Sequence, residues 1–195
     1  MPGSSVSSPA NPFQPFFDHQ RVVVLDGGFA TELERWGAPL DSALWSAKLL
    51  LDDPDALTDV HRSFLEAGAD CIATATYQAS FEGFEKIGVG RDEAERLMLE
   101  SVSLATRAVD DFWALPENRV LRLRPLVAAS LGPYGAFLAD GSEYDGRYSV
   151  GRDVLEHFHL DRLGVMASSA ADVVAFETIP SLIETEVIVQ ILDDT

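Results

Sequence analysis

The stretch Val22-Val23-Val24-Leu25-Asp26-Gly27-Gly28 decides the fold, because an apolar run stops abruptly at a carboxylate followed by two glycines. The run is β-branched and does not alternate with polar residues, which predicts a strand buried on both faces. Glycine reaches backbone angles that other residues avoid and lets another group approach closely. Asp26 is therefore predicted at the carboxyl end of a buried strand, where parallel α/β folds bind ligands. The alternative is a turn in which Asp26 bonds only its own backbone.

Three further apolar runs follow, and each of the four runs precedes a helical pattern. The later runs cover residues 71–77, 126–131 and 173–176, and the helices cover about 53–68, 92–112, 152–168 and the region after Pro180. Asp53 and Gly68 are the expected caps of the first helix. Asp92 and Glu95 form an acidic variant of a capping box at the second. Ile183 is expected on the buried side of the last helix.

A β-α unit repeated four times predicts a parallel sheet of class α/β with right-handed crossovers. A closed (β/α)8 barrel of the TIM type has eight such units over roughly 250 residues. We therefore expect the first four units of such a barrel, a half-barrel with its strands in the order 1-2-3-4. Residues 1–20 contain no Lys or Arg and no apolar core, so they are expected to form a disordered tail ahead of a domain at 21–195.

Charge and cysteine content restrict the partners and the compartment. The chain has 32 acidic and 14 basic residues and a formal net charge of −18, which argues against nucleic acid and anionic membrane surfaces as partners. No apolar run approaches the length of a membrane span. The one cysteine, Cys71, cannot form an intramolecular disulfide, which fits a reducing compartment such as the cytoplasm. Its place inside an apolar run predicts a buried thiol.

Several familiar sites are not supported by the spacing of the residues. Gly27-Gly28 lacks the G-x-G-x-x-G spacing of a phosphate loop. Residues 140–146 fail as a calcium loop because Tyr144 occupies the fifth position. His157 and His159 are two apart on a helix and point to different sides, which makes a poor metal pair. Glu177 directly follows an apolar run, and burying its charge there costs free energy unless the carboxylate faces a site or pairs with an arginine such as Arg152.

Five ordered blocks of sequence resemble the homocysteine S-methyltransferase family. They are LDGGFATELE at 25–34, LWSAK at 44–48, AGAD with TYQAS at 67–70 and 76–80, SLGPYGA with LADGSEY at 130–136 and 138–144, and FETIP at 176–180. The fourth block is similar to the branch that uses S-methylmethionine or S-adenosylmethionine as methyl donor. The resemblance carried by these blocks covers about residues 22–195.

The resemblance implies a zinc-dependent β/α barrel that moves a methyl group from a sulfonium donor to the thiol of homocysteine, giving methionine. It implies that Asp26 and Glu177 hold the homocysteine amino group, and that Gly27, Gly28 and Thr76 shape the pocket. Trp45 and Tyr77 would line the donor side, where a sulfonium cation favours an aromatic face.

The sequence departs from the family in its metal site. The family's zinc-binding cysteines lie in a Gly-x-Asn-Cys block and a Gly-Gly-Cys-Cys block, and neither occurs here. We therefore expect an N-terminal portion of a homocysteine-binding domain, which binds no zinc, has no catalytic residue of its own and is inactive alone. Open barrel edges predict self-association. The alternatives are a non-catalytic half-barrel that binds an amino acid or a partner subunit, and a different β/α-barrel enzyme.

Overall fold

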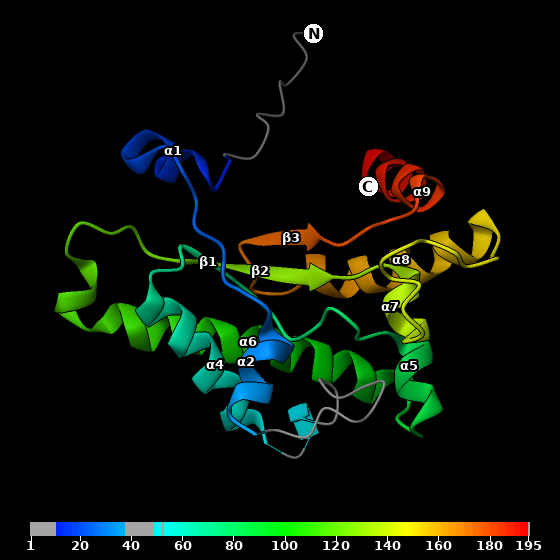
Figure 1. Cartoon of the computed structure of the whole chain (residues 1–195), viewed down its shortest axis with the longest axis horizontal. Helices are drawn as coiled ribbons and strands as arrows, with labels where there is room; N and C mark the ends of the chain where they lie inside the picture. The colour runs from blue at the N-terminus through cyan, green and yellow to red at the C-terminus, as the bar shows by residue number, and fades with distance from the viewer. Residues whose placement is uncertain (1–10, 38–48, 52, 195) are drawn as a thin grey trace, which may run out of the picture.

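The computed structural model describes residues 11–37, 49–51 and 53–194, whose centre is a small parallel sheet (Figure 1). Its strands are β1 (Cys71–Ala73), β2 (Leu126–Leu131) and β3 (Val173–Phe176), in the spatial order β1-β2-β3. Both strand pairs are parallel, and Leu25 adds a parallel bridge to Cys71 on the outer side of β1. The four apolar runs therefore lie side by side in the predicted order.

Residues 22–25 do not form the buried strand that their composition predicts. Only Leu25 bridges to β1, and the side chains of Val22 and Leu25 are 55% and 64% exposed. The backbone bonds to β1 on one side, through Asp26 N–H to the carbonyl of Cys71. Among the described residues no strand pairs with its other side, so the apolar side chains stay in contact with solvent. β1 is likewise shorter than predicted, because the chain turns at Thr76, whose carbonyl accepts from Ala79 N–H.

The helices follow the predicted repeat, with additional short ones. They are α1 (Gln14–Gln20), α2 (Phe29–Arg35), α4 (Pro54–Ala67), α5 (Phe81–Lys86), α6 (Arg91–Ala114), the 3-10 turn η1 (Pro116–Arg119), α7 (Tyr134–Leu138), α8 (Arg152–Ala167) and α9 (Leu182–Asp194). The predicted caps of α4 are confirmed: the Asp53 side chain accepts from Ala56 N–H, and Gly68 has φ +112°. The capping box predicted for α6 is wrong, because Gly90 is the N-cap and Asp92 lies inside the first turn.

The helix α1 corrects the expectation of a tail that extends to about residue 20. Its Phe16 side chain is only 2% exposed, and a proline occupies its first turn. Proline is pre-organised for that position, and burial of an aromatic ring stabilises the packed helix. The expected tail is therefore wrong for residues 14–20, while residues 1–10 lie outside the described ranges.

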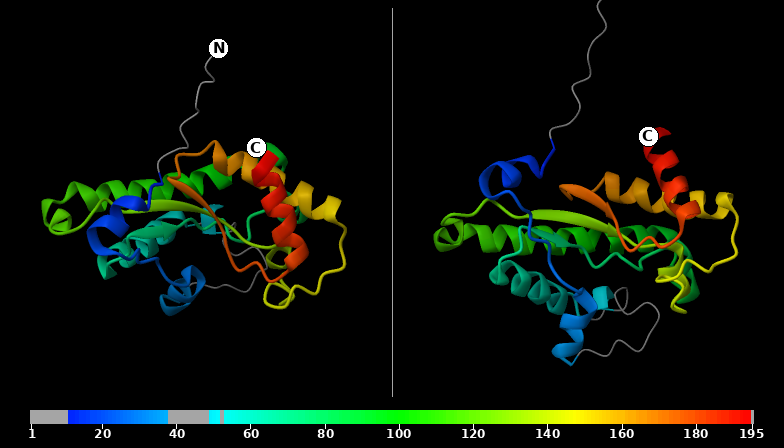
Figure 2. Two further views of the ribbon diagram at one scale, coloured as in Figure 1. Left: turned by 90° about the horizontal axis from the view of Figure 1, so that it is seen from above. Right: turned by 45° about the horizontal axis from the view of Figure 1, so that its top comes forward.

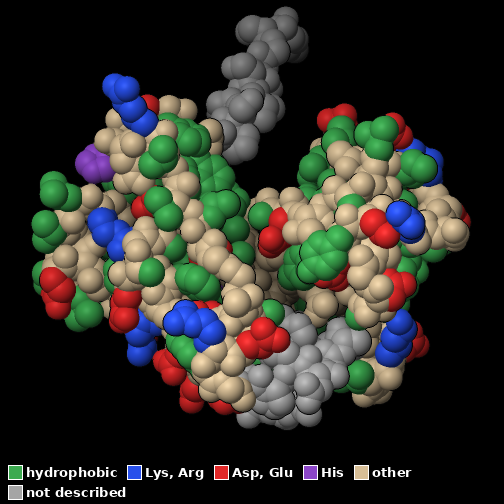
Figure 3. All heavy atoms as spheres, viewed as in Figure 1, with side chains coloured by type: hydrophobic (Ala, Val, Ile, Leu, Met, Phe, Trp, Pro, Cys, Tyr) green, Lys and Arg blue, Asp and Glu red, His purple; other side chains and the backbone are tan. Residues whose placement is uncertain are grey.

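Helices cover one face of the sheet, and the opposite face lines a hollow. α4, α6 and α8 contact the strands, and the strand residues that pack among the helices are Ile72, Val127, Ala129 and Leu131. The alternate residues Cys71, Ala73, Ala128, Ser130 and Ala175 line the hollow. Figure 3 shows this hollow in the surface, between the two ends of the molecule at which the ribbons of Figure 2 place α1 and α9. Within the described ranges no helix is long and apolar enough to cross a bilayer.

A buried carboxylate anchors α9, which the sequence did not predict. Ile183, expected to be buried, is 54% exposed, whereas its neighbour Glu184 is fully buried. Glu184 accepts from Tyr134 N–H at 2.6 Å, from the Tyr148 hydroxyl, and lies 2.8 Å from His159 Nε2. Burial alone would raise the pKa of Glu184, but these hydrogen bonds outweigh it and lower the pKa below its ordinary value. They join α9 to α7 and α8 at the carboxyl ends of the strands.

Candidate functional site

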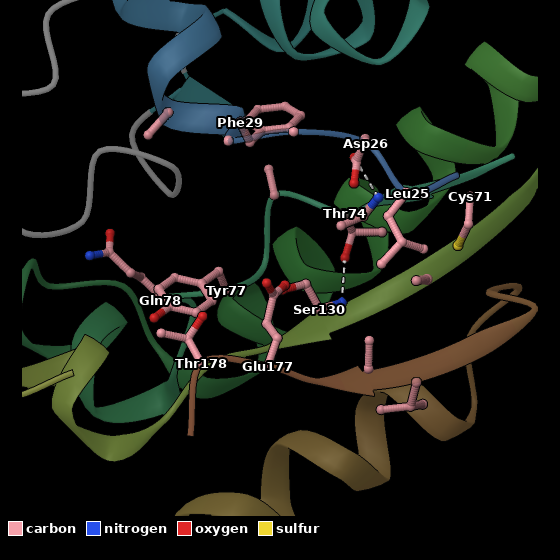
Figure 4. A pocket seen from close by; sticks show the side chains of 18 of the residues that line it. Leu25, Asp26, Phe29, Cys71, Thr74, Tyr77, Gln78, Ser130, Glu177 and Thr178 are labelled. Atoms are coloured by element: carbon pink, nitrogen blue, oxygen red, sulfur yellow. Dashed lines mark hydrogen bonds between the residues drawn. The ribbon is translucent and has the colours of Figure 1, made fainter. Parts of the chain in front are cut away.

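A cavity of about 720 Å³ opens on the hollow face, at the carboxyl ends of the strands. Its walls come from the turn after Leu25, the ends of β1, β2 and β3, and the loop around Tyr144. Figure 4 shows Asp26, Tyr77, Ser130 and Glu177 converging on this space from separate segments. The convergence at one edge of a parallel sheet is the predicted one.

Asp26 is held by a hydrogen bond from β1, and its pKa is raised well above the ordinary value. Its Oδ2 accepts from Ala73 N–H at 2.7 Å, so the alternative of a turn that bonds only its own backbone is wrong. Apart from Ala73, only the backbone N–H of Asp26 itself contributes a hydrogen bond to this carboxylate within the described ranges. Burial, and to a lesser degree the charge of Glu177, raise the pKa of Asp26 from 3.8 to about 7, against the lowering effect of the Ala73 hydrogen bond. The two carboxylates therefore act on one another across the cavity.

Glu177 directly follows β3 and is held by β2. Its Oε1 accepts from the hydroxyl of Ser130, whose side chain is 1% exposed. The proposed ion pair with Arg152 is wrong, because Arg152 pairs with Glu186 at 2.9 Å. Glu177 thus faces the cavity, the other of the two explanations for a carboxylate at this position.

Thr76 supports the pocket from beneath and does not line it. Its side chain is fully buried, and its Oγ1 donates to the carbonyl of Ser130 at 2.7 Å. Thr74 Oγ1 lies 2.6 Å from Thr76 Oγ1 and accepts from Ser130 N–H at 3.0 Å. The two threonines therefore fix the backbone of Ser130, and the Ser130 hydroxyl in turn fixes Glu177. Ser130 and Thr74 were not predicted, although a serine at the end of an apolar strand was a visible signal.

Gly27 and Gly28 line the cavity, and close packing explains them better than unusual backbone angles. A Cβ on Gly27 would lie 3.1 Å from the Phe64 ring, and one on Gly28 would lie 3.0 Å from Thr31 Oγ1. Gly28 has φ −65°, an angle open to any residue. Of the two reasons that the sequence suggested for these glycines, the close approach of another group is confirmed. The need for unusual backbone angles is wrong.

Tyr77 lines the cavity, and a strained residue lies near it. Thr178, also in the wall, has φ +55°, a region that β-branched residues rarely occupy. Burial raises the pKa of Tyr77 to about 12 and keeps the phenol neutral, while the nearby Thr178 side chain has a smaller, lowering effect on that pKa. Strain of this kind gathers at functional sites. Trp45, the other residue expected on the donor side, lies outside the described residues.

The described residues do not offer a zinc site. Within the described ranges, no group of three or more His, Cys, Asp and Glu side chains is arranged so that it could hold a metal ion. Cys71 lies in the cavity wall but is 2% exposed, and burial raises the pKa of its thiol to about 12. His157 is largely exposed and His159 fully buried, so the two histidines do point to different sides. The donor set needed for catalytic zinc does not fit here.

Comparison with known proteins identifies relatives over nearly the whole chain. The chain is 50% identical over 184 residues to "Homocysteine S-methyltransferase YbgG" of Bacillus subtilis, covering 94% of this chain and 58% of that protein. It is 47% identical to the selenocysteine Se-methyltransferase of Brassica oleracea var. italica, covering 88% of this chain and 52% of that one. The chain thus spans little more than half the length of these curated relatives.

Solved structures of a bacterial relative share the fold. The homocysteine methyltransferase MmuM of Escherichia coli in its oxidized form superposes with a TM-score of 0.88 at 40% identity, covering 95% of this chain and 62% of that one. Its metallated form gives 0.87 at 39% identity. The family model described as homocysteine S-methyltransferase matches residues 23–195. This chain therefore belongs to the homocysteine S-methyltransferase family.

Proposed function

We propose that the cavity binds homocysteine by its amino group, which Asp26 and Glu177 receive together. The observation that carries the proposal is that each carboxylate has one oxygen fixed by the protein. Ala73 N–H holds Oδ2 of Asp26, and the Ser130 hydroxyl holds Oε1 of Glu177. No other described residue donates a hydrogen bond to the second oxygens, Oδ1 and Oε2, so both can accept from an ammonium group.

The raised pKa of Asp26 favours an ammonium ligand. With a pKa of about 7, Asp26 is partly protonated in the empty site at neutral pH. An ammonium between the carboxylates replaces the proton as the compensating positive charge, because an opposite charge close by favours the ionised acid. Binding should therefore release a proton near pH 7 and become tighter as the pH rises from 6 to 8.

We further infer that the chain forms about the first four units of a (β/α)8 barrel, and that it supplies the amino-acid pocket for methyl transfer from a sulfonium donor to homocysteine. The parallel order β1-β2-β3 and the match to part of the MmuM chain support this. Zinc bound to a thiol would supply the thiolate nucleophile. Because the described residues do not fit that metal, we expect these 195 residues to bind the amino acid without stoichiometric zinc and without forming methionine.

Calorimetric titration of the 195-residue chain at pH 8 tests the binding proposal. L-Homocysteine should bind, and 4-mercaptobutanoate, which lacks only the amino group, should bind more weakly. Asp26→Asn and Glu177→Gln should each weaken homocysteine binding about tenfold, since charge-assisted hydrogen bonds contribute about 1.5–3 kcal/mol. Glu186→Gln on α9 is the matched control, because Glu186 lies outside the cavity wall and pairs with Arg152. Equal binding of the two ligands, or unchanged binding to both site variants, would contradict the proposal.

A further inference from the structure

Glu184 is a fully buried carboxylate in the first turn of α9, and it does not line the cavity. Its partners come from three different segments: Tyr134 at the start of α7, Tyr148 in the loop that joins α7 to α8, and His159 within α8. Figures 1 and 2 show these three helices together at one end of the molecule. Burying a carboxylate costs free energy even when it is paired, and apolar side chains of similar volume are often as stable. The charge of Glu184 therefore indicates a task beyond filling the core.

We propose that Glu184 is a positioning residue, which fixes one side of the cavity wall through Tyr148 and so sets how tightly the cavity holds its ligand. The loop that joins α7 to α8, residues 139–151, carries both Tyr148 and the wall residues Glu143 and Tyr144. Only three residues separate Tyr144 from Tyr148 in the chain, so a tie at one restrains the other. The inference rests on the proposed function, because the ligand meant is the homocysteine that the cavity is proposed to bind.

The hydrogen bonds inside this loop give it a shape but do not join it to a helix. Gly146 N–H donates to the Ser142 carbonyl at 2.8 Å, and Ser142 N–H donates to Asp140 Oδ1 at 3.0 Å. The Tyr148 hydroxyl makes the join, because its hydrogen bond to Glu184 connects residues 36 positions apart. A hydrogen bond to an ionised carboxylate is about twice as strong as one between neutral groups. The charge of Glu184 thus strengthens the contact that seats the loop.

The protonation states around Glu184 suit this task. Burial raises the pKa of Glu184, but the hydrogen bonds from His159, Tyr148 and Tyr134 N–H outweigh it and keep the pKa below its ordinary value. Burial lowers the pKa of His159, so the ring is neutral at pH 7 and its proton lies on Nε2, 2.8 Å from Glu184 Oε1. Glu184 therefore stays ionised at neutral pH and accepts from three donors at once.

The other turns around the cavity are held by α8 without Glu184. His159 and Arg162 are three positions apart, so they lie on the same side of α8. The fully buried Arg162 donates to the Tyr77 carbonyl at 3.0 Å and to the Gly132 carbonyl at 2.9 Å, which fixes the turns after β1 and β2. Loss of the contact between Glu184 and Tyr148 should therefore loosen the loop between α7 and α8 and leave these two turns in place.

Cleavage by trypsin after Arg147 measures how often the loop opens. The Arg147 side chain is 84% exposed and directly precedes Tyr148, and the cleavage rate follows the population of the locally opened state. Tyr148→Phe removes the hydroxyl, keeps the aromatic ring, and should speed this cleavage about tenfold, as expected for loss of one charge-assisted hydrogen bond. Cleavage after Arg96, which is 57% exposed within α6, should keep its wild-type rate. Glu186→Gln, an exposed position on α9, is the matched control and should change neither rate.

Glu184→Gln tests the charge itself. The amide keeps the size of the side chain and can still accept one hydrogen bond, so the increase in cleavage after Arg147 should be smaller than in Tyr148→Phe. Both variants should bind L-homocysteine about threefold more weakly in calorimetric titration, as residues that act on a site without touching its ligand do. Tyr148→Phe leaves the contacts of Glu184 with α7 and α8 intact, so it carries the test if Glu184→Gln does not fold.

The two measurements separate this inference from the proposed function. Equal acceleration after Arg147 and Arg96 would show a general loss of stability and overturn the positioning role. Unchanged cleavage after Arg147 in Tyr148→Phe would overturn it too, as would faster cleavage with unchanged affinity for homocysteine. A wild-type chain that binds no homocysteine would instead overturn the proposed function, and the cleavage rates would still decide whether Glu184 holds the loop.

Discussion

Asp26 and Glu177 use the same arrangement from opposite sides of the sheet. Each follows an apolar run, and each is held by a single donor from the neighbouring strand, Ala73 N–H or the Ser130 hydroxyl. The charge of Glu177 disfavours the ionisation of Asp26, because a like charge nearby raises the pKa of a carboxyl group. The protein therefore holds negative charge at this site at some cost to its own stability, which a cationic ligand can offset.

Stability should decrease with pH because of Asp26. Its pKa is about 7 in the folded chain against 3.8 ordinarily. Between these values the unfolded chain has lost the proton that the folded chain retains, so rising pH favours unfolding and the effect levels off above pH 7. Relative to Asp26→Asn, the wild-type free energy of unfolding should fall by about 2 kcal/mol between pH 4 and 8, half the full linkage because Asp26 is partly exposed. Urea titrations of the wild-type chain and of Asp26→Asn at several pH values measure the two free energies of unfolding. If both free energies changed with pH by the same amount, the prediction would be contradicted.

The sequence predicted the two carboxylates and did not predict their supports. Asp26 and Glu177 stand out locally, since each breaks an apolar run. The Ser130 hydroxyl holds Glu177, which lies 47 positions further along the chain. The Ser130 N–H in turn donates to the Thr74 hydroxyl, which lies 56 positions earlier. Such pairings depend on strand register, which single-sequence patterns do not specify. Thr76, which the resemblance implied would shape the pocket, lies one layer beneath the pocket wall.

At the scale of elements, two of the β/α units share the same supporting hydrogen bond, made by an aspartate that directly precedes the strand. Asp70 precedes β1 and accepts from Val24 N–H at 2.9 Å, and Asp172 precedes β3 and accepts from Val127 N–H at 2.8 Å. In both cases an aspartate just before one strand holds the backbone of the segment that precedes it in the sheet, the extended residues 22–25 in the first case and β2 in the second. These bonds tie the amino ends of the strands together and leave the carboxyl ends free to carry the site.

The turn after β2 gives a paired prediction. Gly132→Ala places a Cβ 2.7 Å from the Tyr77 ring and the Tyr77 carbonyl, and overpacking of this kind costs about 1–3 kcal/mol. Gly164→Ala in the interior of α8 meets nothing within 4 Å, and alanine is favoured over glycine in a helix by about 1 kcal/mol. Thermal unfolding should therefore show a lower Tm for the first variant and a higher Tm for the second. A neutral Gly132→Ala would show that Tyr77 is not fixed by this contact.

The sequence predicted the helices well where their ends and buried faces follow from residues close together in the chain. The Asp53 cap, the Gly68 end of α4 and the buried stripes of α6 and α8 all depend on residues within a few turns. The run at 22–25 was predicted to be buried because its composition is typical of an inner strand. Its exposure depends on what lies beside it in space, and among the described residues only β1 does.

At the scale of the whole molecule, one face is packed and the other is open. Helices bury the outer face of the sheet, whereas the inner face lines the cavity, which opens as the hollow in Figure 3. The segment at 22–25 remains in contact with solvent. The side chains of Val22 and Val24 are 55% and 47% exposed beside a segment that pairs on one side only. Exposed apolar edges of this kind pair with other chains.

The chain should therefore associate with itself through this edge. Light scattering during gel filtration should show a mass that increases with protein concentration, and an apolar dye should bind. A charged lysine on a strand edge opposes pairing, so Val22→Lys should shift the mass toward the monomer and reduce dye binding. Val120→Lys is the matched control, because Val120 is 67% exposed in a different part of the molecule. A wild-type chain that stays monomeric at every concentration would show that the edge does not pair, and an equal effect of both lysines would show that the association depends on net charge alone.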